Sequence, residues 1–568
     1  MDLEQIKTTE VWALYEKGRN YHRMMGYYTD ADRNYNFYNG DQWAHAKLGG
    51  VEPVQKNFIK PIVKYKVGVT HDNLYAIHYS SQNFENKEFR KEAEKVCEML
   101  NKKAARIWEK DKMDLKGRRV TKDAAINDEG IIYVDYDDEL QMPVNEIVKK
   151  VDVYYGNEND DDIQKQPYIL IRNRVPVLTA REIARREGLS EEKIRMIIGD
   201  NDNFEESGEA AKYELDNMVT LITKMWKENG TVRFTKSTRW VDIKKNKNSG
   251  LTLYNVAHML WEEKEGSARG EGEVRYLIPN QIEVNRTEMR RVLSVKSQAY
   301  PKRIVNESKV TNLSAIDKTG ITIKVKDAGA DDVSKIVNTL APAQMSPDVK
   351  QLQDDLINVT RDLAGAGDAA TGNVDPEAAS GRAILAVQQA SQSPMTEQKE
   401  AYKNFVEDLA RIWLDMLITY NPQGAKLEEE ITDPESGEKI TTVRTVAQET
   451  LKALRAEVKV DITPRSAFDR YAQELSLENL LQAGFFNIQR LQELKTYISI
   501  LPDDANMPKQ KVEEAIRIME EEQRKIIEID AHTQMMQQRM NQFLSEGPDM
   551  QARQILDAEK KLQQKQLG

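Results

Sequence analysis

The sequence predicts an α+β protein that is predominantly helical and built from several domains. Helical segments alternate with strand-like runs over residues 1–280, whereas most of the later chain follows a helical period. A length of 568 residues exceeds what one core usually organises, and a hydrophobic content of 40% can supply more than one core. We therefore expect an α+β region followed by mainly helical regions.

The first region, residues 1–280, contains two runs that predict strands, 130–136 (GIIYVDY) and 231–235 (TVRFT), because apolar and aromatic residues gather there. Two polar stretches, 157–162 and 244–250, are rich in turn-forming residues, and we expect them to be exposed loops.

A helix is predicted over 280–298. Ile282, Met289 and Val292 repeat at helical spacing, and Pro301 ends the pattern.

Residues 320–326 (GITIKVK) alternate apolar and polar side chains, and glycines bracket the run. This alternation predicts a half-buried strand. Its apolar positions are Ile321, Ile323 and Val325.

A further helix is predicted over 346–364. Its apolar residues recur at steps of three and four, which places them in one stripe along a helix. The stripe consists of Val349, Leu352, Leu356, Val359 and Leu363.

The connection at 364–375 (AGAGDAATGNVD) is too long and too rich in glycine for a simple helical hairpin. Glycines lower the cost of changing conformation, and a loop of this length inside a compact protein is usually functional or disordered. Pro376 then suits the first position of a helix whose alanines line one face. The sequence therefore predicts a mobile, functional loop followed by a tightly packed helix.

The remaining chain is predicted to hold a long amphipathic helix at 396–420, a strand at 458–462 and helices from 464 to 568. The apolar stripe of the long helix consists of Tyr402, Phe405, Leu409, Ile412, Trp413 and Met416.

Several motifs follow one another in an order that resembles the portal proteins of tailed bacteriophages. The helix, glycine-rich loop and second helix around 364–375 resemble the tunnel-loop region of that family. Further similar segments are 35–43 (YNFYNGDQW), 57–63 (NFIKPIV), 122–136 (KDAAINDEGIIYVDY), 277–285 (LIPNQIEVN) and 458–464 (VKVDITP).

The resemblance implies a portal-type fold with wing, stem, clip and crown. The implied domains are a wing at 1–280, a first stem helix at 281–300, a clip at 301–345, a second stem helix at 346–365, the tunnel loop and following helix at 366–392, a wing return at 393–463, and a helical crown and tail at 464–568.

The resemblance also implies a ring of twelve copies at the capsid vertex of a virion, assembled in the host cytoplasm. Double-stranded DNA would pass through it without sequence specificity. Other implied partners are the large terminase subunit, the major capsid and scaffold proteins and a head-tail adaptor, whereas no membrane, cofactor, metal or enzymatic activity is expected. The implied site residues are Gly365, Gly367, Asp368, Thr371, Gly372 and Asn373 in the tunnel loop, Arg286, Arg290 and Lys350 in the stem, and Ile321, Ile323 and Val325 at the clip interface.

The stem charges have two interpretations. Arg286, Arg290 and Lys350 could touch DNA phosphates, or they could pair with Asp354 and Asp355 of an adjacent subunit. The net charge of −11 suits a conduit, because a wall that repels phosphates lets a duplex slide.

A different functional class is suggested by residues 178–198, which have the pattern of a helix-turn-helix with Gly188 at the turn and Ser190 as a cap. This pattern is the basis of the alternative function, a DNA-binding regulatory or architectural protein. A plain helical hairpin is the structural alternative, because Glu191 and Glu192 would meet DNA phosphates unfavourably at the start of the second helix.

Other chemical sites are weakly indicated. Residues 135–146 space acidic residues like a calcium loop, but Leu140 occupies the turn position that needs glycine, so we expect an acidic hairpin. His71 and His78 could share a helix face, yet no third metal ligand accompanies them. Cys97, the only cysteine, has helical apolar neighbours and is expected in a core.

Overall fold

The structure is a computed structural model, and the chain divides into two compact units, Met1–Thr463 and Pro464–Gly568. Each unit is considered by itself. The described residues are 7–44, 46–47, 52–80, 87–200, 217–316, 318, 321–326, 329, 336–341, 345–367, 393–432, 439–453 and 457–464, together with short helical stretches of the second unit, chiefly 529–539 and 552–559.

A five-stranded antiparallel sheet in the order β4-β5-β6-β7-β8 forms one part of the first unit. Side chains alternate across its faces. Ile222 packs against helix α1 on one face, while Val219 and Leu221 pack against helices α6 and α7 on the other. The elements are α1 (Glu10–Met25), β4 (Val153–Tyr155), β5 (Ile169–Pro176), α6 (Val177–Arg186), α7 (Glu191–Arg195), β6 (Met218–Glu228), β7 (Thr231–Ser237) and β8 (Asp242–Asn248).

A three-stranded sheet in the order β3-β2-β9 lies in the main core. Helices α5 and α12 pack against it, and all six predicted stripe residues of α12 are at most 2% exposed. Buried Trp413 of α12 donates through Nε1 to Asn145 Oδ1 over 2.9 Å. The elements are α5 (Met113–Asn127), β2 (Glu129–Asp137), β3 (Met142–Val148), β9 (Val256–Leu260) and α12 (Thr396–Tyr420).

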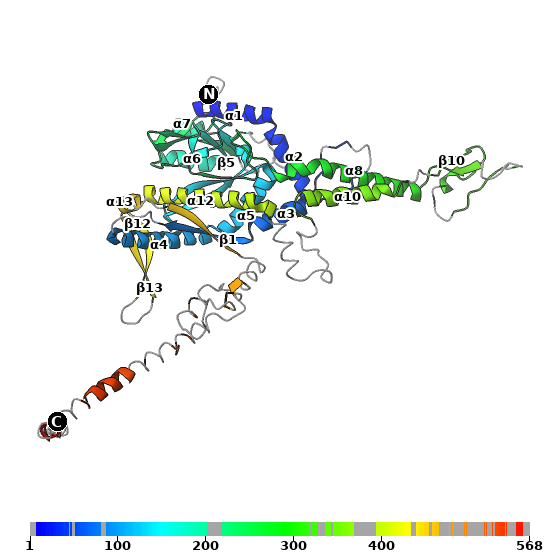
Figure 1. Ribbon diagram of the computed structural model, residues 1–568. Helices are drawn as coiled ribbons and strands as arrows, with labels where there is room; N and C mark the ends of the chain where they lie inside the picture. Colours follow the sequence, from blue (N-terminus) through cyan, green and yellow to red (C-terminus); the bar gives the residue numbers. More distant parts are fainter. Residues whose placement is uncertain are drawn as a thin grey trace. The chain divides into compact units, whose positions relative to one another are not determined.

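Helices α8 (Glu273–Ala299) and α10 (Asp348–Leu363) run antiparallel and side by side (Figure 1). Between them in sequence, β10 (Arg303–Val305) and β11 (Val337–Thr339) form a small antiparallel pair. A separate small cluster of Val310, Ile316 and Ile336 supports this pair.

The remaining elements complete the first unit. They are α2 (Tyr27–Asn39), α3 (Ile59–Thr70), α4 (Lys87–Lys110) and α13 (Gln448–Ala453), the pair β1 (Asn73–Ser80) and β14 (Glu457–Pro464), and the hairpin β12 (Ala425–Thr432) and β13 (Lys439–Val446).

Most predicted elements are confirmed. The helices expected at 280–298, 346–364 and 396–420 correspond to α8, α10 and α12, although α8 begins at Glu273 and contains Pro279. The predicted strands at 130–136, 231–235 and 458–462 correspond to β2, β7 and β14. Residues 135–146 form the β2–β3 hairpin, as expected, and Cys97 is buried.

Two predictions are wrong and a third is confirmed only in part. Residues 244–248 are part of strand β8 and not of a loop. Strand β8 is the edge of the five-stranded sheet and pairs only with β7, and an edge strand tolerates polar and charged side chains. The stretch at 157–162 is a loop, as predicted, and Asn157, Asn159 and Asp161 are exposed, but Glu158 turns inward toward Arg269. His71 and His78 share no helix face, because His71 caps α3 and His78 lies in β1.

The strand predicted over 320–326 is also wrong. Of its described residues, Val325 forms one isolated bridge with Val310, while Ile321 is 49% exposed. The backbone pairing is short, since Thr311 N donates to Lys324 O over 3.0 Å and Lys326 N donates to Lys309 O over 2.8 Å. Side-chain contacts continue it: Lys324 N donates to Asn312 Oδ1 over 2.7 Å, and Asn312 Nδ2 donates to Thr322 O over 2.9 Å. Alternation alone does not form a strand where, in the described residues, the pairing with a partner segment extends over a single bridge.

Candidate functional site

The start of α8 is bound firmly to the sheet region. The backbone N–H of Gly272 donates to Asp128 Oδ1 over 2.8 Å, and Asp128 also pairs with buried Lys150. One residue later, Glu273 forms an ion pair of 2.7 Å with Lys66 of α3. These contacts fix the position of α8 relative to α3 and α5.

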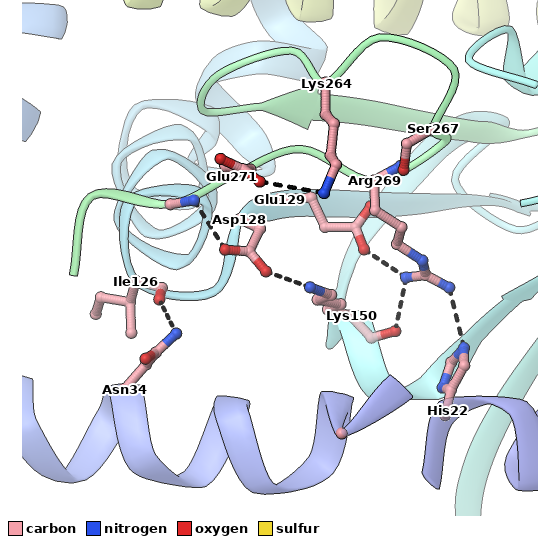
Figure 2. Close-up of polar contacts among 12 residues, drawn as sticks. His22, Asn34, Ile126, Asp128, Glu129, Lys150, Lys264, Ser267, Arg269 and Glu271 are labelled. Atoms are coloured by element: carbon pink, nitrogen blue, oxygen red, sulfur yellow. Dashed lines mark hydrogen bonds and ion pairs between the residues drawn. The ribbon is translucent and has the colours of Figure 1, made fainter. Parts of the chain in front are cut away.

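Arg269 lies just before α8 and is the centre of a buried charged cluster (Figure 2). Its guanidinium pairs with Glu129 and donates to Glu158 Oε2 over 3.0 Å. It also donates to the carbonyl of Val153 over 2.7 Å and to His22 Nε2 over 3.1 Å. The cluster therefore joins α1, β2, β4 and the segment that leads into α8.

The charges of this cluster determine its protonation. Burial alone would raise the pKa of Glu129, but Arg269 and the hydrogen bond with His258 outweigh burial and lower it to about 2. The pKa of Glu158 is likewise lowered to about 2, because Arg269 outweighs its burial. Burial lowers the pKa of His22 to about 4, so His22 is neutral near pH 7 and its Nε2 accepts from Arg269.

The contact between α8 and α10 is polar. Asn280 Nδ2 donates to Thr360 Oγ1 over 2.9 Å. Gln353 accepts from Arg291 over 2.6 Å and donates to Glu288 over 2.8 Å. Gln353 is 0% exposed and Thr360 is 4% exposed, so the buried side of α10 carries amide and hydroxyl groups. These hydrogen bonds set the register of the two helices.

The apolar stripe predicted on α10 lies mainly on the outside. Leu352 is 57% exposed, Val359 is 54% exposed and Leu363 is 83% exposed. Leu356 and Val349 are half-buried. An amphipathic helix normally buries its apolar side, so this stripe is suited to contact a molecule outside the chain.

The predicted stem residues Arg286, Arg290 and Lys350 are all exposed. Arg286 pairs with Glu283 on its own helix over 2.7 Å, a contact of two exposed side chains. Lys350 lies on α10, about one turn before Gln353, which contacts Arg291, so it is near the level of Arg290 but on the other helix. The structure does not bring the three cations together into one patch.

The glycine-rich loop begins directly after α10. Gly365 has a φ of +69°, which favours glycine, and a Cβ on Gly367 would lie 2.2 Å from the Oδ1 of exposed Asp362, whose side chain would have to move. A Cβ on Gly365 would lie 3.9 Å from Pro394, so the chain on the far side of the loop returns to the same place. Asp368, Thr371, Gly372 and Asn373, with the alanine-lined helix predicted after them, lie outside the described residues.

The clip residues divide between two environments. Val325 and Ile323 pack partly against the small cluster of Val310, Ile316 and Ile336, whereas Ile321 is exposed.

Residues 178–198 form a compact hairpin on the five-stranded sheet. Helix α6 ends at a turn in which Gly188 has a φ of +75°, as the pattern predicts. Helix α7 has only five residues, and Ile194 and Ile197 are buried against the sheet. A helix this short and covered offers little surface for reading a DNA groove, so this geometry supports the plain hairpin.

A cavity of about 430 Å³ lies between the five-stranded sheet and the β2–β3 hairpin. Its walls carry charges of both signs. Lys244 and Lys247 are the basic residues, and Glu187, Asp135 and Asp138 are the acidic residues. The hydrogen bond from Lys244 and the nearby Lys247 lower the pKa of Glu187. Among the described residues, no group of three or more His, Cys, Asp or Glu side chains could hold a metal ion.

Two features were missed by reasoning from the sequence. Gln353 and Thr360 are seven residues apart and so fit one side of a helix, but nothing in the sequence marks that side as the buried one. The Arg269 cluster has no local signal, because Glu129 and Glu158 each lie more than one hundred residues before Arg269 in the sequence. In the described part of the chain, no helix is both long and apolar enough to cross a membrane.

Comparison with known proteins adds one finding. A family model described as phage P22-like portal protein matches residues 254–568, which is more than half of the 568 residues. No curated protein matches the chain. The matched segment contains α8, α10, the loop between α10 and α12, and the second unit.

Proposed function

The chain belongs to the phage P22-like portal protein family, and from this membership we propose that identical copies close into a ring at one capsid vertex. The ring is the conduit through which double-stranded DNA enters and leaves the phage head. A heterologous contact between identical subunits generates such a ring when its rotation closes.

The observation that carries the ring is the exposed apolar side of α10. Leu352, Val359 and Leu363 lie in line and are each more than half exposed. Burial of such a side chain stabilises a contact by roughly 1.5–3 kcal/mol. A neighbouring copy that covers this stripe would remove it from water in every subunit of the ring.

The proposed parts follow from the order of the elements. Helices α8 and α10 form the stem, and the β10–β11 segment at their ends forms the clip, on which the large terminase and later the head-tail adaptor dock. The α+β body is the wing, which meets the major capsid and scaffold proteins. The second unit, Pro464–Gly568, is the crown.

The loop at 366–376 is proposed to face the channel. Gly365 and Pro394, on either side of the segment 366–392, lie close together at the end of α10. A net charge of −11 agrees with a channel wall that does not hold DNA. A partner motor supplies the energy for DNA movement.

Electron micrographs of the purified full chain test the ring. We expect annular particles with a central hole. A population of monomers or dimers under all assembly conditions would contradict the proposal. DNA retention by the assembled particles at low salt tests the channel separately, because strong salt-sensitive binding would contradict a wall along which DNA slides.

A further inference from the structure

The α8/α10 pair has two unlike faces, one on each side of the line of contact between the helices. Gln353 and Thr360 of α10 point to α8. Successive residues of a helix are about 100° apart around its axis, so Leu352 and Asp354 lie on opposite sides of Gln353. The front face of α10 is therefore the exposed apolar stripe, whereas its back face is polar. The back face consists of Lys350, Asp354 and Arg361.

Helix α8 can be divided in the same way. Glu288 points to α10, while Gln281 and Asn285 are covered by the segment around Lys56, to which both hydrogen-bond. Glu283 and Arg290 lie on the opposite flank and are exposed. Because the helices are antiparallel, this flank of α8 and the apolar stripe of α10 belong to the same front face.

The charges on the two faces are complementary. Glu283 and Arg290 on the front face are seven residues apart, as are Asp354 and Arg361 on the back face, and each interval spans about 10.5 Å. Two antiparallel helices that meet through these faces place Arg290 opposite Asp354 and Glu283 opposite Arg361. Both contacts then join opposite charges.

The heights of these residues along the pair agree with this match. Within one chain, Arg291 contacts Gln353 and Asn280 contacts Thr360. Rotation about an axis that runs along the helices does not shift one copy relative to the next. The neighbour's Asp354 and Arg361 therefore lie within about one helical turn of the levels of Arg290 and Glu283.

We propose that Arg290 and Glu283 on α8 of one copy pair with Asp354 and Arg361 on α10 of the next copy, an inference that rests on the ring proposed above. The occupant of the front face is thus a second copy of this chain. The pairing sets which faces meet and in what register, and it assigns Arg290 to the subunit boundary rather than to the channel wall.

Charge reversal in matched variants tests this pairing. The α8 variant carries Glu283→Lys and Arg290→Glu, and the α10 variant carries Asp354→Lys and Arg361→Glu. Either variant alone places like charges at both contacts of every interface, so we expect about a tenfold or greater loss of rings at low ionic strength. Glu283, Arg290 and Asp354 are exposed and Arg361 is half-buried, so circular dichroism of each variant checks that its helices remain.

Mixing the two variants restores opposite charges at every boundary if the copies alternate. We therefore expect rings to return in an equimolar mixture. A chain with all four substitutions should assemble by itself but should not co-assemble with the wild-type chain. Arg90→Glu with Glu94→Lys, which swaps an exposed ion pair of α4, is the matched control and should assemble like the wild type.

The outcomes separate the two proposals. If the wild-type chain forms rings and each variant alone forms them equally well, the pairing is wrong and the ring stands. Failure of the mixture to recover rings also overturns the pairing. If the wild-type chain forms no ring, the proposed function itself fails.

Discussion

Gln353 on α10 donates a hydrogen bond of 2.8 Å to Glu288 on α8 and is completely buried, whereas the adjacent Leu352 is 57% exposed. The pair thus has a polar contact inside and an apolar surface outside. An isolated helical hairpin would have the reverse arrangement. This inversion is the reason to expect another copy of the chain on the outer side.

Gln353→Ala should destabilise the packing of α10 on α8. The substitution removes one hydrogen bond to Glu288 and one from Arg291, which keep their mutual ion pair of 3.0 Å, and a lost hydrogen bond to a charged group costs about 1.5–3 kcal/mol. The free energy of unfolding, measured in urea, should fall by that amount. The exposed neighbour gives the control, since Gln351→Ala should change it by no more than about 0.5 kcal/mol. Equal effects would contradict the polar register contact.

Leu352→Ser combined with Val359→Ser should act on assembly and not on the folded chain. Both side chains are more than half exposed, so the unfolding free energy should change by less than about 0.5 kcal/mol for each. Rings should dissociate at higher protein concentration than those of the wild type, as measured by mass photometry. If the variant rings dissociate at the same protein concentration as wild-type rings, no neighbouring copy covers this stripe.

Arg269→Met should be among the most destabilising single changes in the first unit. It leaves Glu129 and Glu158 as buried carboxylates without their cation, which costs about 3–5 kcal/mol. Arg411→Met removes a half-exposed arginine from its ion pairs on α12 and should cost less than about 1 kcal/mol. Thermal unfolding of both variants provides the comparison, and a similar loss in the two would contradict a special role of the cluster.

His22 should make the first unit less stable as the pH falls from 6.5 toward 4. Its pKa is about 4 in the folded chain and 6.5 ordinarily, so the unfolded chain binds the proton first. The loss should reach about 2 kcal/mol by pH 5, before Glu129 and Glu158 are protonated. His22→Gln should flatten the dependence of urea unfolding between pH 6.5 and 5. A dependence as steep as in the wild type would refute this assignment.

Two helical glycines should respond to alanine in opposite ways. A Cβ on Gly117 of α5 would lie 2.1 Å from the hydroxyl of buried Tyr402, so Gly117→Ala should cost about 1–3 kcal/mol. A Cβ on Gly68 of α3 meets nothing within 4 Å, so Gly68→Ala should stabilise by up to about 1 kcal/mol. Melting temperatures that move in the same direction would contradict the packing between α5 and α12.

The elements of the fold could be predicted where local pattern and packing agree. The stripe of α12 is buried as its spacing predicts, and α10 has the predicted bounds within two residues. The pattern of α10 could not say which side faces its partner, because the hydrogen bonds of Gln353 and Thr360 involve residues of α8 about seventy positions away.

The site was harder to predict than the fold. Arg269, Glu129 and Glu158 meet only because separate strands and loops bring them together, so no short motif marks them. The alternation at 320–326 predicted a strand, but pairing needs a partner and the described residues give Val325 a single bridge. The glycines at 365 and 367 stay predicted tunnel-loop residues: Gly365 has a φ of +69°, and a Cβ on Gly367 would lie 2.2 Å from Asp362 Oδ1.

A density map of the assembled wild-type oligomer, resolved to side chains, tests the central claim most directly. We predict a closed ring in which Leu352 and Val359 of each copy contact the next copy and Arg290 lies beside the neighbour's Asp354. A ring in which these side chains face open solvent, or an oligomer that does not close, would contradict it.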